Sequence, residues 1–224
     1  MTIKKAILSV CCGALLSSTV VAGGLFFDDR IAPDTELSPW QFRLRGISIN
    51  PSVDSSTIDN IGGTVSHVSN EQVPELDISY FFNSNLSTEL VLATARHDVE
   101  ATRTTLGTVD LGRVSILPPT LTLVYHFFPH KLLSPYAGAG LNYTHFYNES
   151  SGPVAQDIKY KNSFGPALQA GLDINLNEHW SINFDVKKIF IESDVHVTTN
   201  PTTVSSVDVE LNPYVYGIGI GYRV

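Results

Sequence analysis

Residues Pro74 to Asp98 read PELDISYFFNSNLSTELVLATARHD and contain two alternating segments on either side of a polar turn. Before the turn, Leu76, Ile78 and Tyr80 share one face, and the residues between them are polar or charged. Side chains of a strand point alternately to the two faces of a sheet, so this period of two predicts strands with one apolar face. The Asn-Ser-Asn turn is short and rich in turn-forming residues. The stretch therefore predicts an antiparallel β-hairpin.

The same alternation recurs along the chain and predicts eight strands. They cover residues 40–50, 74–82, 86–99, 115–128, 135–147, 160–176, the segment that begins at 180, and the segment that ends at 224. Short turns near Asn83, Pro129 and Asn177 alternate with long polar segments at 52–72, 100–113, 148–159 and 198–206. This rhythm is typical of an eight-stranded antiparallel transmembrane β-barrel with short periplasmic turns and long extracellular loops.

The composition favours a membrane barrel over other classes. Charged residues make up 16% of the chain, against about 25% in soluble domains. Beyond the N-terminus no apolar run approaches the roughly 20 residues of a transmembrane helix, whereas a membrane strand needs only every second residue to be apolar. The formal net charge of −8 argues against a nucleic-acid partner. A soluble all-β barrel with its apolar face inward is the less favoured alternative.

The N-terminus resembles a secretory signal. Lys4 and Lys5 precede an uncharged apolar stretch, and small residues follow, which places cleavage after Ala22. The predicted organisation is therefore a removed signal peptide at residues 1–22 and a barrel domain at residues 23–224. Cys11 and Cys12 lie inside the signal as apolar filler, and lipoprotein processing at one of them is the alternative. With the signal removed, no cysteine remains for a disulfide or a thiolate metal site.

The two faces of the predicted strands differ in kind. Aromatic residues near the short-turn ends suit an interfacial girdle, and they are Trp40, Tyr80, Phe82, Tyr125, Phe127, Tyr136, Trp180 and Tyr222. The opposite face carries charges of both signs, and we expect these to pair inside the barrel because charge facing lipid is costly. The predicted network contains Arg43, Arg45, Glu75, Asp77, Glu89, Asp173, Asp185, Lys187 and Arg223. Since side chains nearly fill an eight-stranded barrel, the charges predict a structural plug rather than a wide aqueous pore.

The last strand changes its pattern along its length. Val207, Val209, Leu211 and Val215 have one parity, and the apolar residues nearer the C-terminus have the other. Either a bulge near Pro213 shifts the register, or the outer part of the lumen is apolar and these four residues line a channel.

Prolines form a second group of candidates. Central strands normally exclude proline because it donates no ladder hydrogen bond. Prolines in or beside strands either end strands and mark bulges, or mark a lateral opening of the wall. The candidates for such an opening are Pro118, Pro119, Pro166 and Pro213.

Seven ordered segments together resemble the OmpW family of outer-membrane proteins. They are WQFRLR at 40–45, PELDISYFF at 74–82, ELVLATARHD at 89–98, LPPTLTLVYHF at 117–127, YAGAGLNYT at 136–144, ALQAGLD at 167–173 and NPYVYGIGIGY at 212–222. The resemblance implies an eight-stranded barrel with a narrow, largely hydrophobic channel for small hydrophobic molecules, and alkane-uptake proteins are similar. The chain ends in Val224 where such barrels usually end in Phe, the residue that the assembly machinery reads.

Two functions follow from these observations. The first is passive passage of small hydrophobic molecules through a barrel of the bacterial outer membrane. The alternative is a structural barrel whose extracellular loops bind host surfaces, phage or bacteriocins. The sequence predicts no enzyme, no cofactor and no metal site, since its histidines show neither a catalytic motif nor metal-ligand spacing. The predicted partners are outer-membrane lipid, a small hydrophobic solute and the barrel assembly machinery.

Overall fold

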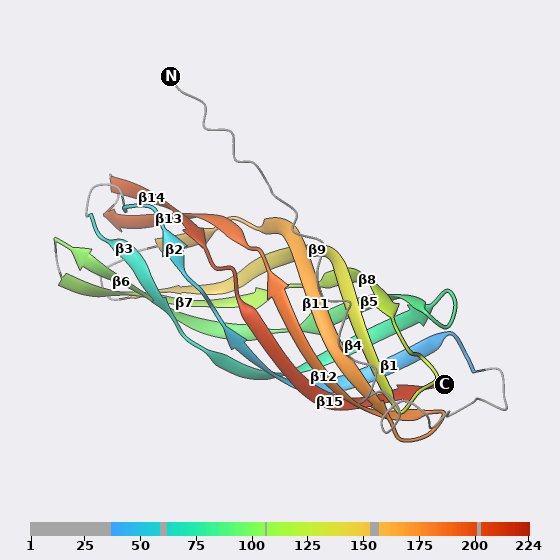
Figure 1. Ribbon diagram of the computed structural model, residues 1–224. Helices are drawn as coiled ribbons and strands as arrows, with labels where there is room; N and C mark the ends of the chain where they lie inside the picture. The colour runs from blue at the N-terminus through green and yellow to red at the C-terminus, as the bar shows by residue number, and fades with distance from the viewer. Residues whose placement is uncertain (1–36, 59–61, 106, 153–156, 201–202) are drawn as a thin grey trace, which may run out of the picture.

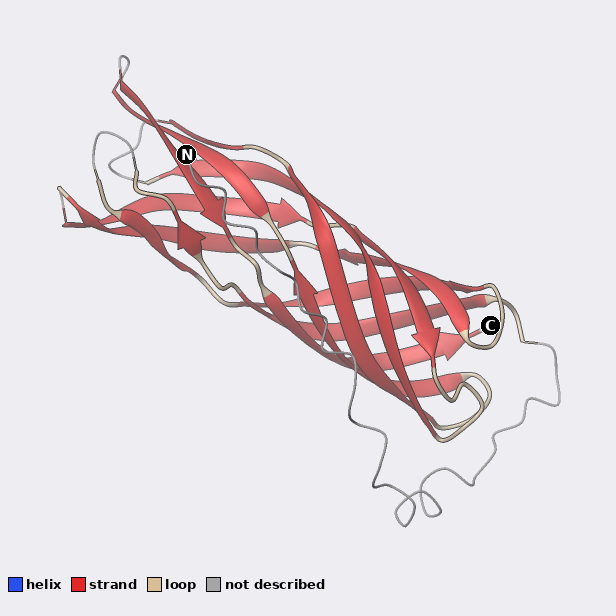
Figure 2. Cartoon of the chain, turned by 45° about the horizontal axis from the view of Figure 1, so that its top comes forward, coloured by secondary structure: helices blue, strands red, loops and turns tan. Residues whose placement is uncertain are grey.

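The computed structural model describes residues 37–58, 62–105, 107–152, 157–200 and 203–224, which form strands, turns and loops (Figure 2). The predicted signal peptide, its cleavage site and both cysteines lie outside the described residues. Within those ranges, no helix is long and apolar enough to cross a membrane.

Eight strands close into one antiparallel ring at the end of the molecule where the chain makes its short turns (Figure 1). In ring order they are β1 (Trp40–Asn50), β4 (Glu71–Phe81), β5 (Leu86–Ala93), β8 (Thr120–His126), β9 (Leu133–Ser151), β11 (Ser163–Asn175), β12 (Trp180–Ile189) and β15 (Tyr214–Arg223). The first and last strands close the ring through a ladder from Gln41–Arg223 to Asn50–Tyr214. A closed ring satisfies its backbone groups without water, as lipid demands. The predicted fold class is confirmed.

Beyond the ring, the chain continues as two sheets that form the other end of the molecule. One contains β3 (Thr64–Val68), β6 (Ala95–Thr104), β7 (Gly107–Leu117) and the end of β9, and the other contains β10 (Asp157–Tyr160), β13 (Glu192–Asn200), β14 (Thr203–Glu210) and β2 (Asp54–Ser55). We call this end the extended half. Its strands occupy much of the sequence predicted as long loops. The predicted strands stopped short of these segments at both ends. The reason is that the many polar residues there hide a regular alternation.

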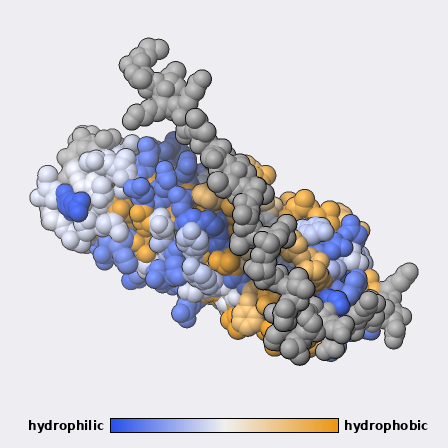
Figure 3. All heavy atoms as spheres, viewed as in Figure 1, coloured by the Kyte–Doolittle hydropathy of each residue, from blue (hydrophilic) through white to orange (hydrophobic). Residues whose placement is uncertain are grey.

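The two halves have opposite faces. In the ring, large apolar side chains project outward, and Leu44, Ile218 and Ile220 are between 52% and 56% exposed. In the extended half, the apolar side chains point inward, and the outward positions of β6 carry charge at Arg96 and Asp98. Figure 3 shows hydrophobic side chains gathered over the ring and hydrophilic ones over the extended half. A lipid-facing belt thus surrounds only the ring.

The aromatic girdle forms as predicted, with one correction. Trp40, Tyr125, Phe127 and Trp180 are exposed on the outer face near the short turns. Tyr136 was wrongly placed in this girdle, because its side chain points inward and is 3% exposed. Its position along the strand is that of the neighbouring inner residues of β9, so the period of two should have outweighed its aromatic character.

Candidate functional site

Arg45 lies at the centre of the charges inside the ring, and its side chain is fully buried. Its guanidinium contacts Asp77 at 2.8 Å, Asp185 at 3.0 Å, Glu89 at 3.2 Å and Glu75 at 3.4 Å. Taking a charge out of water is costly unless other groups compensate for its lost hydration. Here four carboxylates from three strands surround a single cation, so the group is held from several sides of the barrel.

Two further cations complete the network. Arg43 contacts Glu89 at 2.6 Å and Asp173 at 2.8 Å. Lys187 contacts two of the carboxylates around Arg45, each at 2.7 Å. We call this cluster the charge plug; it consists of Arg43, Arg45, Lys187, Glu75, Asp77, Glu89, Asp173 and Asp185.

Neutral side chains donate further hydrogen bonds to the carboxylates of the charge plug. The Tyr136 hydroxyl donates to Asp185 at 2.7 Å, Gln169 Nε2 donates to Glu89 at 2.8 Å, and Asn183 Nδ2 donates to the carboxylate of Asp173 at 2.8 Å. Sequence reasoning did not include Tyr136 and Asn183 among the site residues. Their inward parity was the available signal, but apart from Gln169, which was expected on the inner face, only charged residues were selected.

Glycines on β15 make room for the two arginines. Arg43 pairs with Gly221 and Arg45 with Gly219 in the β1–β15 ladder. A Cβ added to Gly221 would lie 3.3 Å from Arg43 Cγ, and one at Gly217 would lie 3.3 Å from Arg45 Cδ. The alternating glycines near the C-terminus therefore leave inner space that the long arginine side chains fill.

Arg223, which was predicted as part of the network, lies apart from the charge plug. Its guanidinium sits 4.0 Å above the ring of Phe81, and its Nε donates to the carbonyl of Ser38 at 3.3 Å. Within the described ranges it forms no ion pair.

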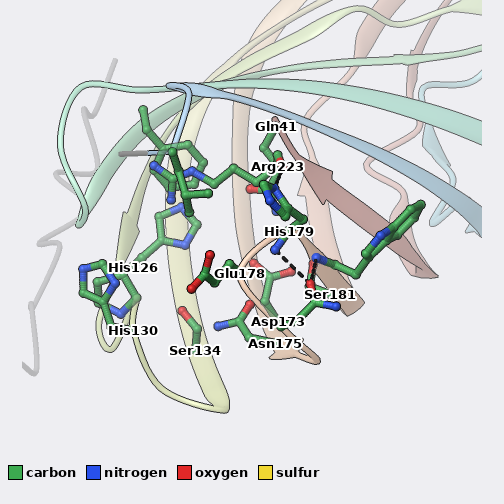
Figure 4. A pocket seen from close by; sticks show the side chains of 15 residues that line it. Gln41, His126, His130, Ser134, Asp173, Asn175, Glu178, His179, Ser181 and Arg223 are labelled. Carbon is green, nitrogen blue, oxygen red and sulfur yellow. Dashed lines mark hydrogen bonds between the residues drawn. The ribbon is translucent and has the colours of Figure 1, made fainter. Parts of the chain in front are cut away.

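A small polar pocket lies at the short-turn end of the ring, below the plug (Figure 4). His126, His130, His179 and Arg223 surround it, and Asp173 of the plug also lines it. His179 Nδ1 donates to the carbonyl of Arg223 at 2.7 Å. The described residues contain no group of three or more His, Cys, Asp or Glu side chains placed to hold a metal ion. The pocket is thus polar and ends at Asp173 of the charge plug.

On the other side of the plug, in the extended half, lies an enclosed space with apolar walls. Its lining is Val65, Val68, Val99, Leu111, Val114, Ile116, Phe146, Val195, Val209 and Leu211, together with His97 and Tyr160. We call it the apolar chamber. Its free space is about 20 Å³, which is about the room one water needs. A larger molecule can enter only if these side chains move apart.

The structure shows which way the apolar residues on both sides of Pro213 face, and so decides between a register shift and an apolar outer lumen. Val207, Val209 and Val215 are all buried inside, at 2%, 5% and 4% exposure, and Leu211 is half-buried. The same parity therefore faces inward on both sides of the break between β14 and β15. Asn212, at this break, has φ 23°. The strand is interrupted without turning inside out, and the outer lumen is apolar.

The candidate prolines occupy two kinds of position. Pro118 and Pro119 separate β7 from β8, and Pro213 separates β14 from β15. Pro166 lies within β11 opposite Leu141 of β9. Three of these prolines thus fall at strand breaks, in agreement with the simpler interpretation that they end strands.

The barrel wall changes character above Pro166, between β9 and β10. The β9–β11 ladder ends at the pair Thr144–Ser163, and the two strands beyond it share no ladder among the described residues. Side chains close the wall instead: Asn162 Oδ1 accepts from the amide of Phe146 at 3.2 Å and lies 3.0 Å from His145 Nδ1. Glu149 accepts from the amide of Tyr160 at 2.9 Å. We call this boundary the side seam.

The side seam separates the apolar chamber from the lipid-facing belt. Phe146 and Tyr160 flank the seam, stack with ring centroids 5.3 Å apart, and line the chamber. On the outer face nearby, Tyr143 and Phe164 are 46% and 68% exposed. Asn162 Nδ2 donates to the Tyr143 hydroxyl at 3.0 Å.

Comparison with known proteins agrees with this arrangement. Residues 39–224 match the OmpW family. The chain belongs to this family. An outer-membrane protein of Sinorhizobium fredii, y4mB, is 41% identical over 198 residues, which are 86% of this chain and 85% of the relative. Outer membrane protein W of Vibrio cholerae is 35% identical over 184 residues, covering 79% of this chain and 84% of that protein.

Among solved structures, the outer membrane protein OprG from Pseudomonas aeruginosa is similar with a TM-score of 0.77. The match has 27% identity and covers 88% of this chain and 99% of OprG. The family and the outer-membrane location predicted from the sequence are confirmed. The OmpW-family barrel described here therefore lies in the outer membrane, with the charge plug inside the ring and the apolar chamber beyond it.

Proposed function

We propose that this OmpW-family protein is a passive conduit for small hydrophobic molecules. The observation that carries the proposal is the opposite character of its two interiors. Once its side chains move apart, the apolar chamber offers such a solute an apolar environment inside the extended half, whose outer face is charged. The charge plug then blocks the way along the barrel axis, because an apolar solute cannot replace the ionic contacts of Arg45. The solute leaves sideways.

The side seam is the exit that the geometry favours. It lies next to the chamber, and side-chain hydrogen bonds of Asn162 and Glu149 take the place of a ladder. The seam has only a few such bonds, each worth about 0.5–1.5 kcal/mol net, whereas a ladder bonds residue after residue along both strands, so the seam should open more readily than a paired strand boundary. Tyr143 and Phe164 would meet the emerging solute at the edge of the lipid-facing belt.

The name of one relative supports the class of solute. PahQ of Pseudomonas aeruginosa is named a dibenzothiophene metabolism operon protein, and it is 25% identical over 189 residues, or 83% of this chain. Dibenzothiophene is a neutral apolar aromatic compound, the chemical class that the chamber walls suit. The same proposal assigns the protein no catalytic role.

Uptake of naphthalene tests the conduit in cells that lack the protein and are then supplied with it. Val209→Asp places a charge in the chamber wall, where desolvation opposes an apolar solute. We expect naphthalene uptake to rise with the wild type and to fall about tenfold with this variant at equal amounts of folded barrel. The matched control is Ser206→Asp, which puts the same charge on the exposed face of β14.

The exit is tested by a reversible lock across the seam. His145→Cys combined with Asn162→Cys joins two side chains whose atoms are in contact in the wild type. Oxidation should abolish uptake, and reduction of the same protein should restore it, so that the reduced form is its own control. If neither the lock nor the charge in the chamber changes naphthalene uptake, the conduit is refuted. Surface interaction is then the remaining function.

Export and membrane insertion of the protein are part of the same proposal. We infer that residues 1–22 are removed on export and that the barrel assembly machinery inserts residues 23–224. The terminal strand β15 closes the ring against β1, so recognition of this strand precedes closure.

A further inference from the structure

Two aromatic rings stack across the side seam. Phe146 belongs to β9 and Tyr160 to β10, so the two residues stand on opposite sides of the seam. Their rings are nearly parallel, with an interplanar angle of 17° and centroids 5.3 Å apart. Both side chains also line the apolar chamber, where the other lining residues are aliphatic apart from His97. The stacked pair therefore lies where the chamber meets the seam.

No backbone ladder fixes the spacing of these two rings. Beyond the pair Thr144–Ser163, the part of β9 that carries Phe146 shares no ladder with β10 among the described residues. The backbone of Tyr160 is held toward β9 by the side chain of Glu149, which accepts from its amide at 2.9 Å. Widening of the seam therefore breaks side-chain hydrogen bonds, parts the rings and uncovers one face of each.

The parted rings favour an aromatic solute over an aliphatic one. Aromatic rings stack with an offset at centroid separations of about 4.5–7 Å, and this contact stabilises beyond the burial of apolar area. A flat aromatic solute between Phe146 and Tyr160 stacks on both rings and so replaces the contact that they lose. A saturated ring system of similar size buries apolar area but offers neither ring an aromatic face.

We propose that Phe146 and Tyr160 form a binding site for flat aromatic hydrocarbons, which pass between the two rings on their way from the chamber to the lipid-facing belt. The inference rests on the proposed function, since it names the class of solute that the exit through the side seam prefers. On the outer face near the seam, the exposed rings of Tyr143 and Phe164 continue the aromatic surface. Phe146 and Tyr160 are thus residues that determine specificity.

The test compares naphthalene with decalin, its fully saturated analogue, which has the same carbon skeleton and no aromatic face. Initial uptake of each is measured in cells that produce the complete protein, and uptake by cells that lack it is subtracted. Tyr160→Leu and Phe146→Leu each remove one ring and keep an apolar side chain in the chamber wall. The matched control is Tyr160→Phe, which loses the same hydroxyl as Tyr160→Leu but retains the ring.

At equal amounts of folded barrel, we expect each leucine variant to lower naphthalene uptake about fivefold, the worth of one stacked pair of rings. Decalin uptake should not fall, and Tyr160→Phe should take up both probes as the wild type does. If the leucine variants change neither uptake, change both by the same factor or only raise that of decalin, the rings select nothing, and the inference fails while the conduit stands. If uptake of neither probe depends on the protein, both proposals fail.

Discussion

At the scale of single residues, Arg45 decides the character of the ring interior. Four carboxylates contact its guanidinium, and its side chain has no exposed surface. Removing one partner of a buried ion pair leaves an uncompensated charge, which costs about 3–5 kcal/mol. Arg45→Met keeps much of the side-chain volume and leaves these carboxylates without their central cation. We therefore expect this single change to destabilise the whole barrel.

The measurement is urea unfolding of the refolded barrel in detergent micelles, followed by tryptophan fluorescence. Arg45→Met should lower the free energy of unfolding by about 3–5 kcal/mol. Arg96→Met, at an exposed position on β6, should change it by no more than about 0.5 kcal/mol. Equal stabilities for the two variants would show that the charge plug does not hold the ring together.

The residue scale also shows what parity can and cannot predict. The period of two placed Arg43, Arg45 and Lys187 on the inner face together with their carboxylates, because lipid outside excludes charge at those positions. It could not show that Arg223 lies apart, since the partner of a long side chain depends on its height along the barrel. The chamber was left as one of two alternatives for Val209 and its neighbours.

At the scale of elements, β1 and β15 pack their backbones together where the ring closes. A Cβ added to Gly219 would lie 2.1 Å from the carbonyl oxygen of Leu44, whereas one added to Gly46 meets nothing within 4 Å. The backbone of a paired strand cannot move aside without losing its ladder. Gly219→Ala should therefore cost about 1–3 kcal/mol through overpacking, and Gly46→Ala should be neutral.

The two alanine variants are compared by the heat-dependent shift of folded barrels in gel electrophoresis after refolding. We expect a reduced folded fraction for Gly219→Ala and a wild-type fraction for Gly46→Ala. A wild-type fraction for both would mean that the β1–β15 boundary is looser than its register indicates. The pair is matched, since each variant adds one methyl group to adjacent strands of the same boundary.

The sequence predicted the strands of the ring better than those of the extended half. The ring strands stand out in the sequence because large apolar side chains on their outer face alternate with polar ones. The beginnings of β7 and β10 were missed, since there Val109 or Ile158 alternates with polar residues in a segment that is polar on average. A pattern of small inward apolar residues in a polar segment resembles a loop until its pairing partners are known.

At the scale of the whole molecule, the two halves differ in how they are closed. Ladders link every pair of neighbouring strands in the ring. The extended half consists of two sheets, joined by the side seam and, at the opposite boundary, by Ser55 Oγ, which accepts from the amide of Val65 at 2.9 Å. The extended half should therefore open locally at a lower free energy than the ring, as regions with fewer mutual contacts do.

Lowering the pH should widen the difference between the extended half and the ring in the free energy of local opening. Burial holds the pKa of His97 below its usual 6.5, although the Ser69 carbonyl and the carboxylates of Glu71 and Asp98 oppose the shift. The opened state then binds more protons than the closed one, so the stability contributed by neutral His97 is complete above 6.5. It is lost progressively as the pH falls from that value toward the folded pKa. Because the chamber is closed by the extended half alone, the ring should not respond.

Hydrogen exchange of the barrel in nanodiscs, measured above and below pH 6.5 and corrected for the intrinsic effect of pH on exchange, tests this expectation. On acidification, exchange should accelerate at β6 and β3, which meet around His97, and stay unchanged at β1 and β15. His97→Asn cannot titrate, so it should remove the pH dependence while keeping the difference between the halves. Acceleration that persists in this variant would assign the titration to another group, and equal acceleration in the ring would show that the barrel opens as one unit.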